Sequence, residues 1–127
     1  MAFLADEANV SQEGKLNVMG IFDRIASSTF PTVHPRMVFA FRMQSEYADS
    51  ETTFPVRVRL IDEDGGTMFE ANGEMTAPRV GPGEFSTANQ VFTLVGTRFP
   101  QPGTYKFVVH VGDELFHEVP FAVTAAS

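Results

Sequence analysis

Along the chain, short runs rich in Val, Phe, Ile and Thr are separated by clusters of Gly and Pro. β-branched and aromatic residues are typical of strands, whereas Gly and Pro are typical of the turns between strands. No run has the 3.6-residue hydrophobic period of an amphipathic helix. The pattern predicts about eight strands, near residues 2–9, 15–25, 36–44, 54–61, 67–75, 87–96, 104–111 and 115–124.

The alternation within these strands indicates which side chains face the interior. From Arg36 to Met43 every second residue is large and apolar, while Arg36 and Arg42 point the other way. Strands of this kind form antiparallel sheets with one solvated face. The sequence therefore predicts a single all-β domain over residues 1–127, a two-sheet antiparallel β-sandwich, with a closed β-barrel as the alternative. The side chains expected to be buried together between the sheets are Phe39, Phe41, Phe107, Val109 and Phe121.

Two hairpins have a register that the pattern selects. Asp64-Gly65 is typical of a two-residue type I′ turn, which pairs Leu60 with Phe69 and places Arg59 beside Glu70. A shift of one residue would set apolar Leu60 against Glu70, so this register is favoured.

In the C-terminal hairpin, two apolar sets face together only across a loop of odd length, which we assign to residues 112–114. These sets are Tyr105, Phe107, Val109 and Val111 on one strand, and Leu115, His117, Val119, Phe121 and Val123 on the other. Pro120 cannot donate a hydrogen bond within a sheet, so its strand is expected at an edge or a bulge.

Charge and cysteine content exclude several classes of function. The 127-residue chain has 9 Lys and Arg against 16 Asp and Glu, a net charge of −7, which repels nucleic acid and anionic membranes. The absence of Cys excludes disulfides and thiolate chemistry. Because Asp6 and Glu7 interrupt the first apolar run, we expect no secretory signal and a cytoplasmic protein.

The candidate metal and cofactor motifs are incomplete, so neither kind of site is predicted. His34 lies in a proline-rich loop, and the C-terminal register sends His110 and His117 to opposite faces. The acidic segment at 62–66 lacks the final Glu of a calcium loop, since that position is Gly73. The glycine-rich segment at 80–84 lacks the Lys of a phosphate loop.

One polar cluster remains as a candidate, formed by Asp6, Asp23, Arg24 and His34. Asp6 lies in an apolar strand, and Asp23 and Arg24 end the next one, so two carboxylates meeting in a cleft would suit acid–base catalysis. The structural interpretation is an inward Asp6 held by backbone N–H groups or by an Arg.

Several segments resemble a bacterial family catalogued only as a domain of unknown function. The resemblance is carried by 4–10 (LADEANV), 14–25 (GKLNVMGIFDRI), 30–36 (FPTVHPR), 102–107 (PGTYKF) and 119–123 (VPFAV). It covers nearly the whole chain and implies an immunoglobulin-like β-sandwich, without implying an activity.

Three functions follow as hypotheses. The first is a non-catalytic binding or assembly module that contacts another protein or itself, with a phage-like or host-defence assembly as one setting. It is favoured because both faces of the strand at 16–22 are apolar, which suits a central strand or a subunit interface. The alternative is a small-ligand-binding domain, and the third is an enzyme that uses Asp6 and Asp23.

Overall fold

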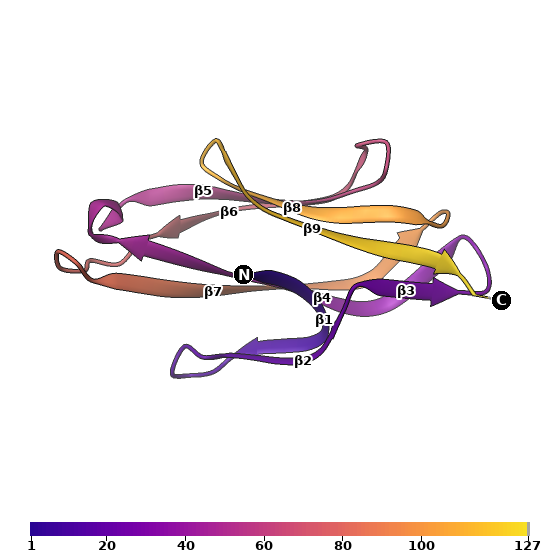
Figure 1. Cartoon of the computed structure of the whole chain (residues 1–127), viewed down its shortest axis with the longest axis horizontal. Coiled ribbons are helices and arrows are strands. Elements are labelled where there is room, and N and C mark those ends of the chain that lie inside the picture. Colours follow the sequence, from indigo (N-terminus) through magenta and orange to yellow (C-terminus); the bar gives the residue numbers. More distant parts are fainter. Residues whose placement is uncertain (127) are drawn as a thin grey trace.

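The computed structural model describes residues 1–126 and consists of two β-sheets packed face to face (Figure 1). One sheet has the strand order β2-β1-β4-β7 and the other has the order β3-β9-β8-β5-β6. The predicted two-sheet sandwich is confirmed, and over residues 1–126 the sheets do not close into a barrel. The elements are β1 (Ala2–Val10), β2 (Leu16–Phe22), β3 (Arg24–Ser27), β4 (Thr32–Glu46), the 3₁₀ turn η1 (Tyr47–Asp49), β5 (Thr53–Ile61), β6 (Thr67–Thr76), β7 (Phe85–Phe99), β8 (Gly103–Val111) and β9 (Glu114–Ala125).

The predicted strand at 15–25 is two strands that belong to different sheets. β2 pairs with β1, and after Asp23 the chain crosses to the other sheet, where β3 pairs with β9. The Asp23 carbonyl accepts a hydrogen bond from the Ala122 N–H at 2.9 Å, which begins this second pairing. The β3–β9 pair is parallel, so the prediction of wholly antiparallel sheets was wrong at this place.

The core between the sheets is built on phenylalanine rings, as the alternation predicted. All five predicted core residues are at most 3% exposed, namely Phe39, Phe41, Phe107, Val109 and Phe121. Phe39 of β4 and Phe107 of β8 stack across the two sheets, with ring centroids 4.5 Å apart and an interplanar angle of 9°. These five side chains, four of them Phe rings, therefore pack the two sheets against each other.

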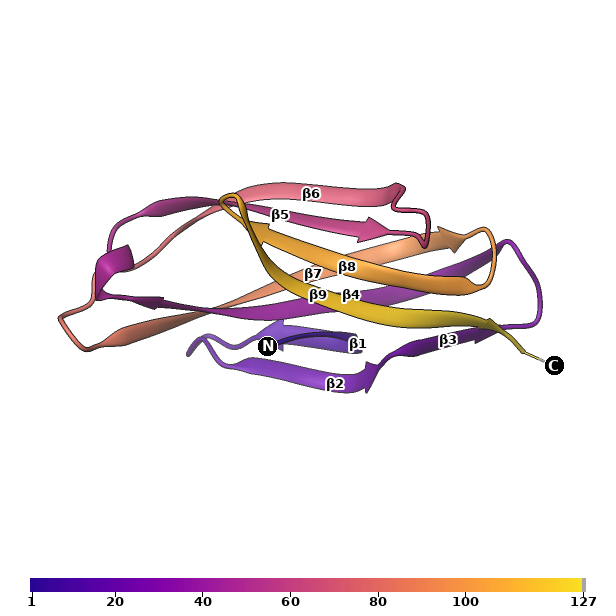
Figure 2. The same cartoon turned by 45° about the horizontal axis from the view of Figure 1, so that its top comes forward.

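The middle of the outer face of β4 is covered rather than solvated. Val38 and Ala40 point away from the core and are 0% exposed, in a second apolar cluster with Ala8, Leu16 and Val18 of the β1–β2 hairpin. The tip of this hairpin is held to β7, since the Asn89 side-chain amide donates to the Gly14 carbonyl at 2.9 Å. Figure 2 shows the hairpin lying below β4 and β7. The face of β2 that carries Leu16 and Val18 is therefore apolar because it packs on the outer face of β4.

The β5–β6 register is confirmed, but the turn that produces it is different. Leu60 pairs with Phe69 and Arg59 with Glu70. At the tip, the Asp62 N–H bonds to the Gly66 carbonyl and only Gly65 has a positive φ, which makes a three-residue loop instead of a type I′ turn. A bulge beside Leu60 restores the predicted register. The ion pair of Glu70 is made by Arg57, whose Nε lies 2.8 Å from Oε1, and not by Arg59.

A bulge also explains the difference in the β8–β9 hairpin. Tyr105 pairs with Phe121 and Val109 with His117, as predicted, but the loop is the two-residue turn at 112–113. Gly112 has φ +62°, as the first central residue of a type II′ turn requires. The extra residue is taken up by the register shift beside His110, and Leu115 is 54% exposed instead of inward.

Pro120 lies on a part of β9 that is open on one side. Because β3 pairs only with residues 122–125, β9 has a single hydrogen-bonded neighbour, β8, over residues 114–121. The predicted edge position of Pro120 is therefore confirmed.

Candidate functional site

Within residues 1–126, no side-chain hydrogen bond or ion pair joins the four residues of the predicted polar cluster. Asp6, Asp23 and Arg24 are all exposed, so the expected inward position of Asp6 was wrong. Asp6 lies beside Gly20, whose positive φ of +72° and missing side chain leave room for the carboxylate. Among the ion pairs of residues 1–126, none includes these three residues. His34 is half-buried against the Phe22 ring, with centroids 5.9 Å apart.

His117 contacts aromatic rings, and the acidic tip of the β5–β6 hairpin is ordered by hydrogen bonds to its own backbone. His117 lies opposite Val109, against the rings of Phe41 and Phe116, whereas His110 pairs with Leu115. Burial lowers the pKa of His117 below its ordinary value. Asp62 Oδ1 accepts the N–H groups of Asp64 and Gly66, which orders the tip of the β5–β6 hairpin. Across the described residues, no three His, Cys, Asp or Glu side chains group as metal ligands would.

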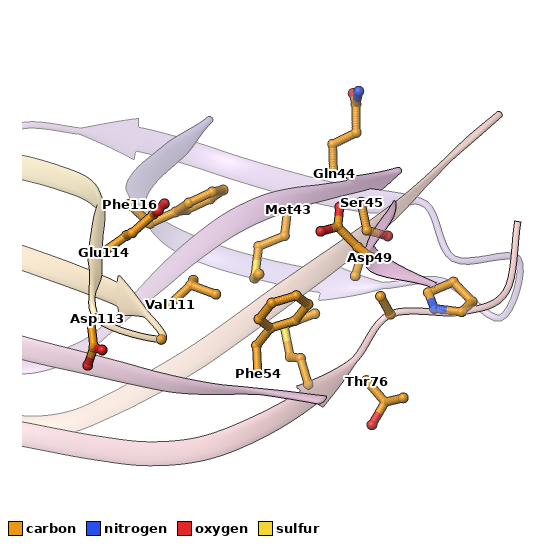
Figure 3. A pocket seen from close by; sticks show the side chains of 15 residues that line it. Met43, Gln44, Ser45, Asp49, Phe54, Thr76, Val111, Asp113, Glu114 and Phe116 are labelled. Carbon is orange, nitrogen blue, oxygen red and sulfur yellow. The ribbon is translucent and has the colours of Figure 1, made fainter. Parts of the chain in front are cut away.

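A cleft of about 480 Å³ opens at one end of the sandwich, between the two sheets (Figure 3). It is formed by the end of β4, the starts of β5, β7 and β9, and the ends of β6 and β8. Figure 3 shows Met43, Phe54 and Val111 pointing into the space between the layers. The apolar side chains that line it are Met43, Phe54, Met75, Ala77, Pro78, Ala88, Val111 and Phe116. The cleft continues the apolar core to the surface.

The charged groups that line this cleft are all acidic. They are Asp49, Asp113 and Glu114, and no Lys, Arg or His is among the lining residues. Asp49 is held in place because its Oδ2 accepts the Glu46 N–H at 2.9 Å. In Figure 3, Glu114 lies beside the Phe116 ring, while Asp113 points away from the cavity. The cleft therefore combines an apolar floor with a negative rim, which favours an apolar group that carries positive charge nearby.

The wall of the cleft beside η1 is fixed by several hydrogen bonds. Ser50 Oγ accepts the Val80 N–H at 3.1 Å, and the N–H groups of Glu51 and Ala77 bond to the carbonyls of Ala77 and Thr52. Glu51 has φ +62°, the one positive φ of a non-glycine residue in residues 1–126. A strained residue of this kind persists where its surroundings determine it, and such positions are common at functional sites.

Three exposed apolar side chains belong to segments that neighbour the lining residues along the chain or across a strand pair. Tyr47 in η1 is 56% exposed, Phe85 at the start of β7 is 63% exposed, and Leu115 of β9 is 54% exposed. Tyr47 and Leu115 adjoin lining segments in sequence, and Phe85 pairs with Glu46 next to η1. Sequence reasoning missed this site because its residues come from six strands and meet only in the folded chain. The available signal was the inward alternation of Met43 and Val111 at strand ends.

Comparisons with known proteins give a family but no activity. No curated protein matches the chain. Among solved structures, the Pseudomonas fluorescens alkylpurine DNA glycosylase AlkC, bound to DNA containing an abasic site analog, shares 15% identity with a TM-score of 0.45. The match covers 98% of this chain and 30% of that chain, a likeness too low to bear on function. No helix in residues 1–126 is long and apolar enough to span a membrane. A family of unknown function, DUF6941, matches residues 1–124, and the chain belongs to that family.

Proposed function

We propose that the protein is a non-catalytic binding module that acts through protein–protein contacts at its end cleft. The occupant is a partner segment with a large apolar side chain flanked by Lys or Arg. The observation that carries this proposal is the combination, in one cleft, of an apolar floor with a rim on which every charged group is acidic.

The apolar part of the occupant follows from the floor. Met43, Phe54, Met75 and Val111 present thioether, aromatic and aliphatic surface, and burial of such surface is the main favourable term in association. Methionines adapt to side chains of different shape, so this floor suits Phe, Leu or Met equally well. Exposed Tyr47 lies in η1, which also contributes Asp49 to the cleft, and adds aromatic contact area of the kind enriched at protein interfaces.

The basic residues expected in the occupant follow from the acidic rim of the cleft and from the negative net charge of the whole chain. Asp49 and Glu114 face an incoming ligand without a nearby lining cation, and the net charge of −7 repels acidic segments at longer range. Complementary charge of this kind contributes mainly to association rate and specificity. Binding is therefore expected to weaken as ionic strength rises.

A small ligand is the second candidate for the same cleft. The volume of about 480 Å³ lies within the range of small-molecule sites, about 300–1,000 Å³. Small-molecule sites also need convergent polar groups that fix orientation. Here Gln44 and Asp113 point away from the cavity in Figure 3, which leaves Asp49 and Glu114 as the charged groups that could orient a ligand. A peptide, which is also oriented by contacts beyond the cleft, is therefore favoured.

Fluorescence anisotropy with labelled peptides tests the proposal. A peptide with Phe between Lys and Arg residues is compared with the same peptide carrying Glu, and with a basic peptide lacking Phe. We expect only the first to bind, Glu114→Lys to weaken it about tenfold, and the matched reversal Asp64→Lys, at the opposite end of β5, to leave it unchanged. Equal binding of all three peptides, or equal effects of both reversals, would contradict the proposal. Binding of a small apolar amine with the affinity of the whole peptide would favour the second candidate.

A further inference from the structure

β7 presents a long edge with none of the usual protection. It pairs with β4 alone in the described residues, so its other side leaves backbone N–H and C=O groups unpaired. Residues 85–97 contain no charged residue and no Pro, and Arg98 is the first charge. Soluble proteins normally protect such edges with charges, prolines, bulges or short strands, because an open edge pairs with another chain.

The other open edges of the described sheets carry such protection. β6 contains Glu70 and Glu74, and β3 has four residues. The open part of β9 contains Glu114, Glu118 and Pro120. β2 is uncharged, but it has seven residues and is interrupted at Gly20, which has φ +72°. β7 runs for 15 residues, with its first positive φ at Gly96, so residues 85–95 form the longest regular edge.

We propose that two copies of the chain associate through β7, in an antiparallel pair about a two-fold axis at Gln90. The two four-stranded sheets then join into one continuous sheet. This proposal goes beyond the end cleft and does not depend on it.

The faces of the strand restrict the register. Ala88, Gln90, Phe92 and Leu94 lie opposite core-facing residues of β4, and the residues between them lie on the outer face. In an antiparallel pair, residues directly opposite each other lie on the same face of the joined sheet. The core-side residues of β7 all have even numbers, so they meet each other only in a register in which the numbers of opposite residues add up to an even value.

Pairing about Gln90 uses the whole regular run and matches its exposed apolar ends. Phe85 of one copy lies opposite Val95 of the other, and these side chains are 63% and 77% exposed in the single chain. Thr87 lies opposite Thr93, and both are exposed. No charge meets a like charge, because the run has none. The exposed Phe85 and Val95 then gain partners at each end of the interface.

The expected association is modest. An 11-residue strand is about 37 Å long and a sheet is about 10 Å thick, so the two copies bury about 700 Å² in total. Stable complexes bury about 1,200 Å² or more, so we expect a weak dimer that dissociates reversibly on dilution.

Sedimentation velocity over about 5–500 µM tests the pairing. The wild type should move from 14.0 kDa toward twice that mass as concentration rises. T87K/T93K sets Lys against Lys at two places and should weaken association at least about tenfold. T87E/T93K sets Glu against Lys across the same pairs and should restore it. T67K/T104K adds the same charge at exposed threonines of the other sheet and should leave the dimer unchanged.

Each other outcome overturns the proposal. A wild type that remains at 14.0 kDa over the whole range has no such dimer. A dimer that T87K/T93K does not weaken uses another surface, for example exposed Met19 and Ile21 of β2. Failure of T87E/T93K to restore the dimer rules out the register about Gln90. Far-UV circular dichroism of every variant checks that it is folded.

Discussion

The stacked rings of Phe39 and Phe107 give a quantitative test of how the sheets are held together. Both side chains are 0% exposed, and they are the pair with the smallest centroid separation between the sheets, at 4.5 Å. Replacing either residue with Leu keeps most of the apolar volume but removes the stacked pair. Each single change is expected to lower the free energy of unfolding by about 1.5 kcal/mol.

The double variant distinguishes a true contact from general burial. Aromatic pairs are worth about 0.5–1.5 kcal/mol beyond their buried area, so Phe39→Leu with Phe107→Leu should cost less than the sum by that amount. Urea unfolding followed by far-UV circular dichroism measures each free energy. Phe99 is the control partner for Phe39, because its ring contacts in the described residues are to Tyr105 and Phe121.

For the control pair, the losses of unfolding free energy caused by Phe39→Leu and Phe99→Leu should add up in the double variant to within about 0.5 kcal/mol. Additive behaviour of Phe39 with Phe107 would refute the reasoning, because the two rings would then contribute independently and not as a contact between sheets.

Three further predictions concern stability. Phe41→Ala should lower the free energy of unfolding by about 3–5 kcal/mol, measured by urea unfolding, because the ring is 0% exposed. Since burial lowers the pKa of His117, the unfolded chain binds a proton before the folded chain does, and stability should fall as pH drops below about 6.5. In His117→Phe, the free energy of unfolding should fall less between pH 7.5 and 5.5 than it does in the wild type. An equal fall in the two proteins would contradict the role of His117. Gly20→Ala should cost about 1–2 kcal/mol, since φ is +72° and a Cβ would overlap the Asp6 carboxylate; Asp6→Ala should recover part of that loss in thermal melts.

The sequence predicts the strands and their registers better than their turns and corners. Leu60 pairs with Phe69 as the alternation required, because a shift would have buried Glu70. The loops differ, because a bulge adds one residue to a strand without changing the pattern beyond it. The crossing at Asp23 was missed because this single residue, without a Gly or Pro turn, separates β2 from β3 although they belong to different sheets.

The covering of β4 and the end cleft depend on tertiary placement. Val38 and Ala40 are buried only because the β1–β2 hairpin folds over them. The cleft joins residues from Met43 to Phe116, which no local spacing connects. The candidate site inferred from the sequence, at Asp6 and Asp23, was chosen from neighbouring carboxylates, and the structure leaves both exposed.

The methionine methyl groups offer the most direct test of the proposed binding cleft. Met43 and Met75 line the cleft, whereas Met19 is 72% exposed on β2 and Met68 lies on β6 outside the cleft. In a protein labelled with ¹³C at the methionine methyls, titration with the Lys-Phe-Arg peptide should shift the Met43 and Met75 resonances together and leave those of Met19 and Met68 unchanged. Binding that shifts Met19 or Met68 while Met43 and Met75 stay in place would contradict the account.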